Sequence, residues 1–168
     1  FHSSSPEGWF VGTAGLKVVC PGTVEDAYGL LRAAIEDPDP VLYFEHKRLY
    51  RTLRGAAPLP SHRTPIGPAH VVREGSDATV VTYGSGVTTA LAAAESVDGD
   101  VEILDLRTVW PLDEAAVLAS LERTSRVLVL QEAARSIGAA GLVLSLVARE
   151  GFELLDAPPA LHAPPDTP

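Results

Sequence analysis

The 168 residues contain no methionine and a single cysteine, Cys20. One cysteine excludes an intrachain disulfide and a zinc site built from several cysteines. Cys20 ends a short apolar run, so we expect a buried structural thiol rather than a nucleophile. No apolar run reaches the roughly eighteen residues that a membrane helix needs. We therefore expect a protein of a reducing compartment with no membrane segment.

Positive charge is also scarce. Thirteen lysines and arginines stand against 22 acidic residues, which gives a net charge of −9. This balance argues against a protein that binds nucleic acid over its whole surface. One local basic cluster exists, comprising Lys47, Arg48, Arg51 and Arg54. It is either a solvated face or a contact for an anionic partner or another subunit.

The sequence does contain alternating strand and helix patterns. Residues 16–20 are typical of a short strand that Pro21-Gly22 closes. Apolar residues at helical spacing then predict a helix from about residue 24, with Thr23 as its cap. The run Asp37-Pro38-Asp39-Pro40 ends this helix, because proline cannot continue it. Residues 41–44 predict the next strand.

A second alternating region follows a stretch rich in proline and glycine, residues 54–68, which we interpret as a linker. Strands are predicted at 78–83, 101–106 and 127–130, and helices at 87–97, from about 112, and at 135–150. This order is typical of an α/β protein with a parallel sheet covered on both faces. The first region is too small to cover its own apolar faces, so the chain is expected to be a fragment.

Three places carry residues suited to chemistry. Gly84-Ser85-Gly86 follows a strand, and Asp105 ends the next one, which outlines a dinucleotide site or an ordinary tight turn. Asp37 and Asp39 lie at a helix end, where oxygen ligands suit a hard cation or where the helix simply stops in solvent. His2 precedes three serines, and alone it is typical of a terminal remnant.

Longer motifs give a specific resemblance. HSSSPEGWF, GLKVVCPGTVEDAYGLLRAAIEDPDPVLYFEHKRLYR, PIGPAHVVREGSDATVVTYG, VEILDLRTVWPLDE, VLVLQEAARS and PDTP occur in this order along the chain. Together they resemble the β subunit of the thiamine-diphosphate-dependent 2-oxo acid dehydrogenase decarboxylase component, with EHKRLYR favouring the branched-chain type. The resemblance covers essentially the whole chain.

The resemblance implies a fold and an assembly. Residues 1–53 would be the C-terminal part of a pyrimidine-binding α/β domain, 54–68 a linker, and 69–168 a transketolase C-terminal-type α/β domain cut short at its end. Partners would be an α subunit, a second β subunit in an α2β2 assembly, and the lipoyl acyltransferase component. Thiamine diphosphate would be bound mostly by absent segments and the α subunit, which would also hold Mg²⁺. The expected location is the bacterial cytoplasm.

The resemblance also implies site residues. His2 matches a histidine at the active-site mouth that helps in acylation of the lipoyl group. Ala34, Asp37 and Asp39 match a structural potassium (K⁺) site formed largely by backbone oxygens. The Gly84 turn becomes an ordinary strand-to-helix turn. Residues 138–141 could form either a subunit contact or a simple buried helix. EAARSIG and LHAPPDTP depart from the family pattern, so no contact is carried over from there.

The predicted reaction is oxidative decarboxylation of a branched-chain 2-oxo acid with acyl transfer to lipoyl. The alternatives are a pyruvate or acetoin dehydrogenase β subunit, or a non-catalytic α/β assembly module. The chain by itself is predicted to be inactive, because the glutamate that activates the cofactor in this family is absent.

Overall fold

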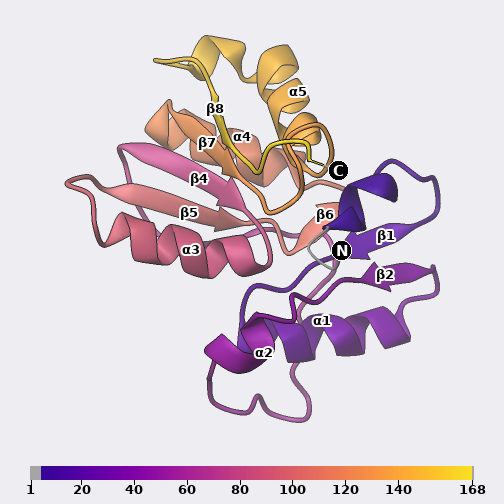
Figure 1. Cartoon of the computed structure of the whole chain (residues 1–168). Helices are drawn as coiled ribbons and strands as arrows, with labels where there is room; N and C mark the ends of the chain where they lie inside the picture. Colours follow the sequence, from indigo (N-terminus) through magenta and orange to yellow (C-terminus); the bar gives the residue numbers. More distant parts are fainter. Residues whose placement is uncertain (1–4, 168) are drawn as a thin grey trace.

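The computed structural model describes residues 5–167 (Figure 1). Its elements follow one another as η1 (Pro6–Trp9), β1 (Lys17–Val19), α1 (Val24–Glu36), β2 (Val41–Tyr43), α2 (Leu49–Thr52), β3 (His70–Arg73), β4 (Ala78–Thr82), α3 (Ser85–Ala94), β5 (Val101–Asp105), β6 (Thr108–Trp110), α4 (Glu114–Thr124), β7 (Val127–Leu130), α5 (Ala140–Glu150), η2 (Phe152–Leu154) and β8 (Ala160–His162). They form two sheets, so the α/β class expected from the alternating pattern is confirmed.

The first sheet has the order β2-β1-β6. Strands β1 and β2 are parallel and are joined by α1, as the sequence predicts. The Thr23 side chain accepts a hydrogen bond from the Asp26 amide at 3.0 Å and so caps this helix. Strand β6 comes from the second region and pairs antiparallel with β1. We call residues 5–53 the first unit and residues 69–167 the second. One edge of the first unit is therefore covered by the second, which the sequence pattern did not predict.

The second sheet has the order β3-β5-β4-β7-β8, in which only the edge strand β3 is antiparallel. Helix α3 lies on one face, and α4 and α5 lie on the other (Figure 1). Alternation along β5 serves both faces, because Ile103 packs with the α3 side and Leu104 with the larger core on the α4 and α5 side. Both residues are almost fully buried.

Two segments differ from the sequence predictions. The helix predicted at 135–150 begins only at Ala140, and the preceding residues form a loop in which Gly138 has φ +103°. The small and apolar residues there are typical of a helix, but the Ile137 carbonyl accepts a hydrogen bond from the Gln131 side chain instead of from the backbone of a following turn. The stretch 54–68 contains no helix or strand, and it runs along α1, where Thr64 and Arg63 contact Asp26 and Glu36.

Within residues 5–167, none of the helices combines the length and apolar character needed to span a bilayer.

Candidate functional site

His2 lies outside the described residues, but the segment that follows it is fixed by the second unit. Glu7, in η1, is 2% exposed, and its carboxylate accepts a hydrogen bond of 2.7 Å from the Tyr83 hydroxyl at the end of β4. Burial and the neighbouring Glu7 charge both raise the pKa of Tyr83, so this hydroxyl stays protonated and donates. This bond joins residues 76 positions apart.

A second contact holds the same segment. A Cβ on Gly8 would overlap the backbone of Gly138, so these two backbone segments approach as closely as glycine allows. Gln131 shapes that loop, because its amide donates to the Ile137 carbonyl at 2.6 Å and accepts from the Ala140 amide at 2.9 Å. The loop EAARSIG and the motif SPEGW thus form one packed surface.

The predicted metal residues lie at the end of α1. The Lys17 ammonium is 2.7 Å from Asp37 Oδ1 and 3.1 Å from Asp39 Oδ2. The hydrogen bond from Lys17 lowers the pKa of Asp37, and the Asp39 amide, which donates to the same carboxylate, lowers it further. In the described part of the chain no three His, Cys, Asp or Glu side chains gather as a metal cluster. The two carboxylates are therefore engaged by a lysine.

The backbone carbonyl oxygens at the end of α1 differ from these carboxylates as ligands for a cation. Proline at position 38 has no N–H, so it cannot donate to the carbonyl of Ala34 four residues earlier. Helix α1 ends at Glu36, which leaves its last carbonyls without helical partners. Carbonyl oxygens at a helix C-terminus carry partial negative charge and suit a hard cation. The backbone, unlike the carboxylates, therefore fits a potassium ion.

The Gly84 turn lies between the two units. Gly84 has φ +57°, and a Cβ there would come within 2.5 Å of His46 Nδ1. His46 instead receives the Ser85 amide at 3.1 Å, while its Nε2 lies 3.1 Å from the Glu132 carboxylate. The first amide of α3 is therefore used by a side chain of the first unit. It does not face an open phosphate site.

Asp105 is equally closed to a ligand. It is completely buried, with one oxygen accepting from the Arg107 amide at 2.9 Å and the other without a hydrogen-bond partner. Burial raises the pKa of this carboxyl to about 7. A ribose cannot reach it, so the structure favours the tight-turn interpretation of Gly84-Ser85-Gly86 over a dinucleotide site.

A buried ion pair also joins the units. Arg107, with φ +55°, places its guanidinium 2.9 Å from Asp26 Oδ1 on α1. Asp26 is 1% exposed, and the hydroxyls of Thr23 and Thr64 donate to its two oxygens. Sequence reasoning missed this network, because nothing local to either residue indicates a partner 81 positions away.

Cys20 lies next to this junction. It is 1% exposed, with its sulfur 3.8 Å from His46 Nδ1, and burial raises its thiol pKa well above the ordinary value. Such a thiol stays protonated, so it is the structural cysteine that the sequence predicts.

Comparison with known proteins is consistent with this geometry. Residues 67–168 match the family model of the transketolase C-terminal domain, and residues 2–52 match the transketolase pyrimidine binding domain. A solved structure named as a split gene transketolase, an inactive beta4 tetramer, aligns over 99% of this chain and 54% of its own, with a TM-score of 0.80 and 20% identity. At that identity it shows the fold alone.

Curated relatives are closer in sequence. The 2-oxoisovalerate dehydrogenase subunit beta of Bacillus subtilis is 44% identical over all of this chain and 52% of its own length. The 3-methyl-2-oxobutanoate dehydrogenase subunit beta of Mycobacterium tuberculosis is 46% identical over 99% and 49%. The pyruvate dehydrogenase E1 component subunit beta of B. subtilis is 42% identical over 99% and 52%.

The chain thus spans about half the length of the curated relatives that it matches. These relatives are β subunits of 2-oxo acid dehydrogenases, so the resemblance predicted from the sequence motifs is confirmed. The C-terminal domain match alone covers more than half of the residues, and the chain therefore belongs to the transketolase C-terminal domain family.

Proposed function

We propose that this chain is the C-terminal part of a 2-oxo acid dehydrogenase β subunit of the branched-chain type. The assembled enzyme would oxidatively decarboxylate a branched-chain 2-oxo acid and transfer the acyl group to a lipoyl arm. The observation that carries the proposal is whole-chain identity of 44–46% with two β subunits named for branched-chain substrates. The packing of the SPEGW motif against Tyr83 and Gly138 supports it, since that packing positions the segment after His2.

Thiamine diphosphate belongs to this proposal as the cofactor of the assembled enzyme, where it supplies the nucleophile and electron sink for decarboxylation. Among residues 5–167, the hollow at the carboxyl ends of the first two parallel strands is too small to hold it. The hollow at the carboxyl ends of β1 and β2 measures about 170 Å³, below the roughly 300 Å³ at which small-molecule pockets begin. Segments of the β subunit beyond this chain and the α subunit, with Mg²⁺, would therefore bind it.

His2 is proposed as the acid–base or positioning group for acyl transfer. Imidazole exchanges a proton near neutral pH. It is therefore suited to protonate the sulfur that is released when the lipoyl S–S bond breaks and the other sulfur takes the acyl group. The Glu7–Tyr83 bond and the Gly8–Gly138 approach, five and six residues further along the chain, support this proposal.

Potassium is proposed at the carbonyl oxygens of Ala34, Asp37 and Asp39. The missing donor at Pro38 supports this role for Ala34, and the Lys17 contacts leave the carboxylates out of it. A bound ion would fix the turn between α1 and β2.

The proposed partners are an α subunit, a second β subunit in an α2β2 assembly, and the lipoyl acyltransferase component. A cytoplasmic location stays a prediction.

The proposal is tested with the β subunit that contains this chain, assembled with its α subunit. We expect decarboxylation of 3-methyl-2-oxobutanoate at a kcat/KM at least tenfold above that for pyruvate, and no turnover by the 168-residue chain alone. His2→Ala should slow acyl transfer to a lipoyl domain about 100-fold while decarboxylation with an artificial electron acceptor persists.

The alternatives give different results in the same assay. Preference for pyruvate or acetoin would assign the chain to those enzymes, whose β subunits are 42–44% identical to it. Assembly with the α subunit but no turnover of any 2-oxo acid would favour a non-catalytic assembly module.

A further inference from the structure

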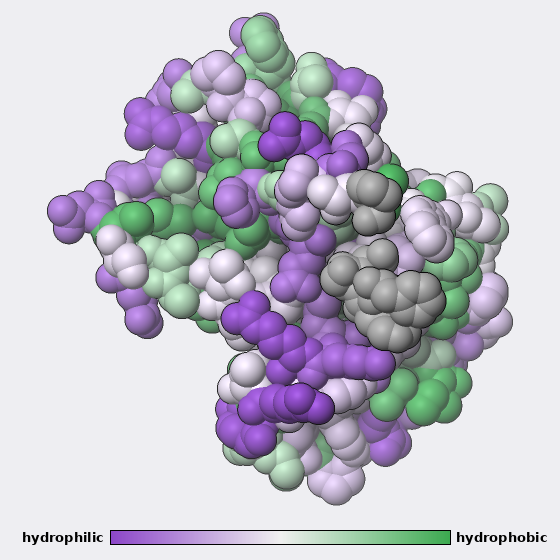
Figure 2. Space-filling view, in the orientation of Figure 1, coloured by the Kyte–Doolittle hydropathy of each residue, from purple (hydrophilic) through white to green (hydrophobic). Residues whose placement is uncertain are grey.

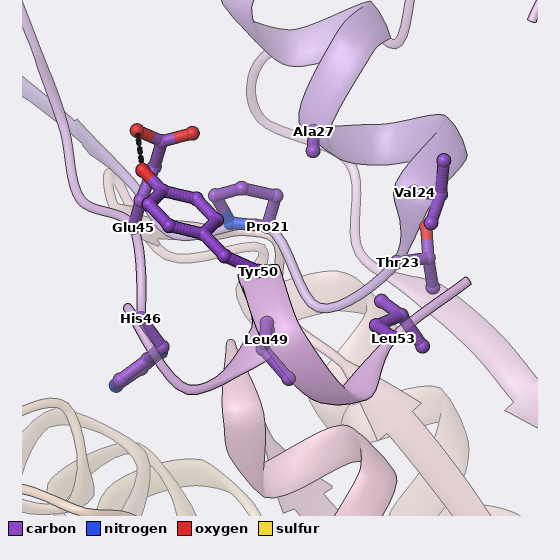
Figure 3. Close-up of a pocket in the computed structure, with 9 residues that line it drawn as sticks. All are labelled: Pro21, Thr23, Val24, Ala27, Glu45, His46, Leu49, Tyr50 and Leu53. Atoms are coloured by element: carbon purple, nitrogen blue, oxygen red, sulfur yellow. Dashed lines mark hydrogen bonds between the residues drawn. The ribbon is translucent and has the colours of Figure 1, made fainter. Parts of the chain in front are cut away.

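A hollow of about 170 Å³ opens between α1 and α2. Figure 3 shows Val24 and Ala27 of α1 on one side, and Leu53 and Tyr50 of the α2 segment on the other. Tyr50 is 60% exposed, and its hydroxyl donates to the Glu45 carboxylate at 2.5 Å. The lining is mainly apolar, and a space of this size accepts one side chain such as leucine, since a cavity of about 150 Å³ holds benzene.

The hollow occupies a position that favours binding. Pro21 and Thr23 follow β1, and Glu45 and His46 follow β2, so the lining includes the carboxyl ends of both parallel strands. Ligands of open α/β sheets bind outside these strand ends. Among its described residues, 5–9, the proposed acyl-transfer segment contributes none to the lining of this hollow.

Beside the hollow lies a basic row formed by Lys47, Arg48, Arg51 and Arg54. All four are exposed, and within residues 5–167 none has a carboxylate oxygen within 4.0 Å. Arg32 and Arg63, by contrast, both pair with Glu36 on the adjacent helix. Strongly hydrophilic residues cover the region of α2 in Figure 2.

This row is unusual in a chain whose net charge is −9. Arg54 also caps α2, because its guanidinium donates to the Tyr50 and Leu53 carbonyls at 3.1 and 2.7 Å. Within residues 5–167, no such contact with a carbonyl holds the side chains of Lys47, Arg48 and Arg51. They are therefore the cations available to a ligand.

We propose that this hollow and basic row form a docking site for an acidic peptide segment of a partner protein, with one apolar side chain as its anchor. The anchor fills the space between Ala27 and Leu53, and flanking carboxylates pair with Lys47, Arg48 and Arg51. Because the three exposed cations lie on separate residues before and within α2, they match a chain of carboxylates better than one small anion. The overall acidity disfavours nucleic acid. The inference goes beyond the proposed decarboxylase function and does not depend on it.

The test measures binding of the labelled peptide Glu-Glu-Leu-Glu-Glu to the protein by fluorescence anisotropy. We expect binding that weakens at least tenfold between 50 and 500 mM salt, as exposed charge pairs are screened. The triple variant Lys47→Gln, Arg48→Gln and Arg51→Gln should weaken it at least tenfold. The matched control replaces Arg126, Arg135 and Arg149, exposed cations of the second unit, by glutamine and should change affinity less than twofold.

The apolar anchor is tested separately. Replacing the peptide's leucine by alanine should weaken binding about tenfold. Ala27→Leu fills the hollow and should reduce that ratio to about one, with salt dependence retained. Circular dichroism and thermal melting of each variant verify folding.

Any of four outcomes would overturn the proposal. The triple variant and its control could bind alike, or the two peptides could bind alike to the unaltered protein. Inorganic phosphate could displace the peptide at constant ionic strength, which would make the row a small-anion site. Self-association that the triple variant abolishes would assign the surface to a second copy of the chain.

Discussion

Among single residues, Asp105 has the clearest consequence for pH dependence. Its pKa is about 7 in the folded protein, against 3.8 for an ordinary aspartate, because burial disfavours the charge. Between these values the folded state holds one more proton than the unfolded state, so stability falls as pH rises, by at most about 1.4 kcal/mol per pH unit. Above pH 7 both states are deprotonated and the loss is complete.

Asp105→Asn removes this titration while keeping an acceptor for the Arg107 amide. We expect the free energy of unfolding of the variant, relative to the unaltered protein, to rise from pH 5 to pH 7 and then to level off. Urea denaturation across this range measures it. Asp98→Asn, at an exposed site, is the control and should show no such trend. A difference independent of pH would contradict the argument.

The bond between Glu7 and Tyr83 gives a second prediction. Tyr83→Phe leaves a buried carboxylate without its donor, which should lower the free energy of unfolding by about 1–3 kcal/mol. Glu7→Gln keeps an acceptor oxygen for the hydroxyl and should cost less. Denaturation of both variants and of their combination gives the coupling energy, and additive effects would show that the charge of Glu7 adds nothing to the bond.

These residues also show where sequence reasoning about the site stopped. The motif around His2 was found because it is long, but the anchor of its Glu7 is Tyr83, which directly follows β4 and lies 76 positions further on. Sequence spacing also did not indicate that Lys17 on β1 contacts the carboxylates of both Asp37 and Asp39. A salt bridge between distant elements leaves no trace in local spacing, since it depends on how β1 and α1 pack.

At the scale of elements, the strand-to-helix turn at Gly84 is the most constrained. Gly84→Ala adds a Cβ 2.5 Å from His46 and 2.8 Å from Cys20 Sγ, at φ +57° and ψ −130°. This conformation is essentially restricted to glycine. We expect a loss of about 3 kcal/mol or more in the free energy of unfolding, from strain and overlap together.

Gly12→Ala separates those two causes. Gly12 also has positive φ, at +83°, but a Cβ there meets nothing within 4 Å. Its cost should therefore be strain alone, about 1–2 kcal/mol. Equal losses in the two variants, measured by chemical denaturation, would show that the contact with His46 and Cys20 is unimportant.

Element prediction succeeded where the pattern was long. The helical repeat from Val24 and the cap at Thr23 gave α1, and the apolar runs gave β4, β5 and β7. Strands β3, β6 and β8 were missed because each holds only two consecutive apolar residues, whereas the equally short β1, β2 and β7 lie in longer apolar runs. The predicted start of the last helix was too early, because the small residues before Ala140 form a loop that Gln131 holds. Tertiary contacts decided that segment, not propensity.

For the whole molecule, the two units behave as one according to their shared contacts. Strand β6 pairs with β1, Tyr83 binds Glu7, His46 accepts from Ser85, and Arg107 pairs with Asp26. We therefore expect a single cooperative unfolding transition for the chain. Arg107→Met should uncouple the unfolding of the two units, because it leaves Asp26 buried without its cation. The expected loss in the free energy of unfolding is about 3–5 kcal/mol.

Hydrogen exchange read by mass spectrometry distinguishes local from global effects. In Arg107→Met, amides of β1 and α1 should exchange faster than those of β4 and β5, since the first unit loses its link to the second. Arg123→Met is the matched control, because Arg123 pairs with the buried Glu102 inside the second unit. It should accelerate exchange in β5 and α4 without uncoupling α1. If both variants open the whole chain equally, the Arg107–Asp26 pair is not what joins the two units.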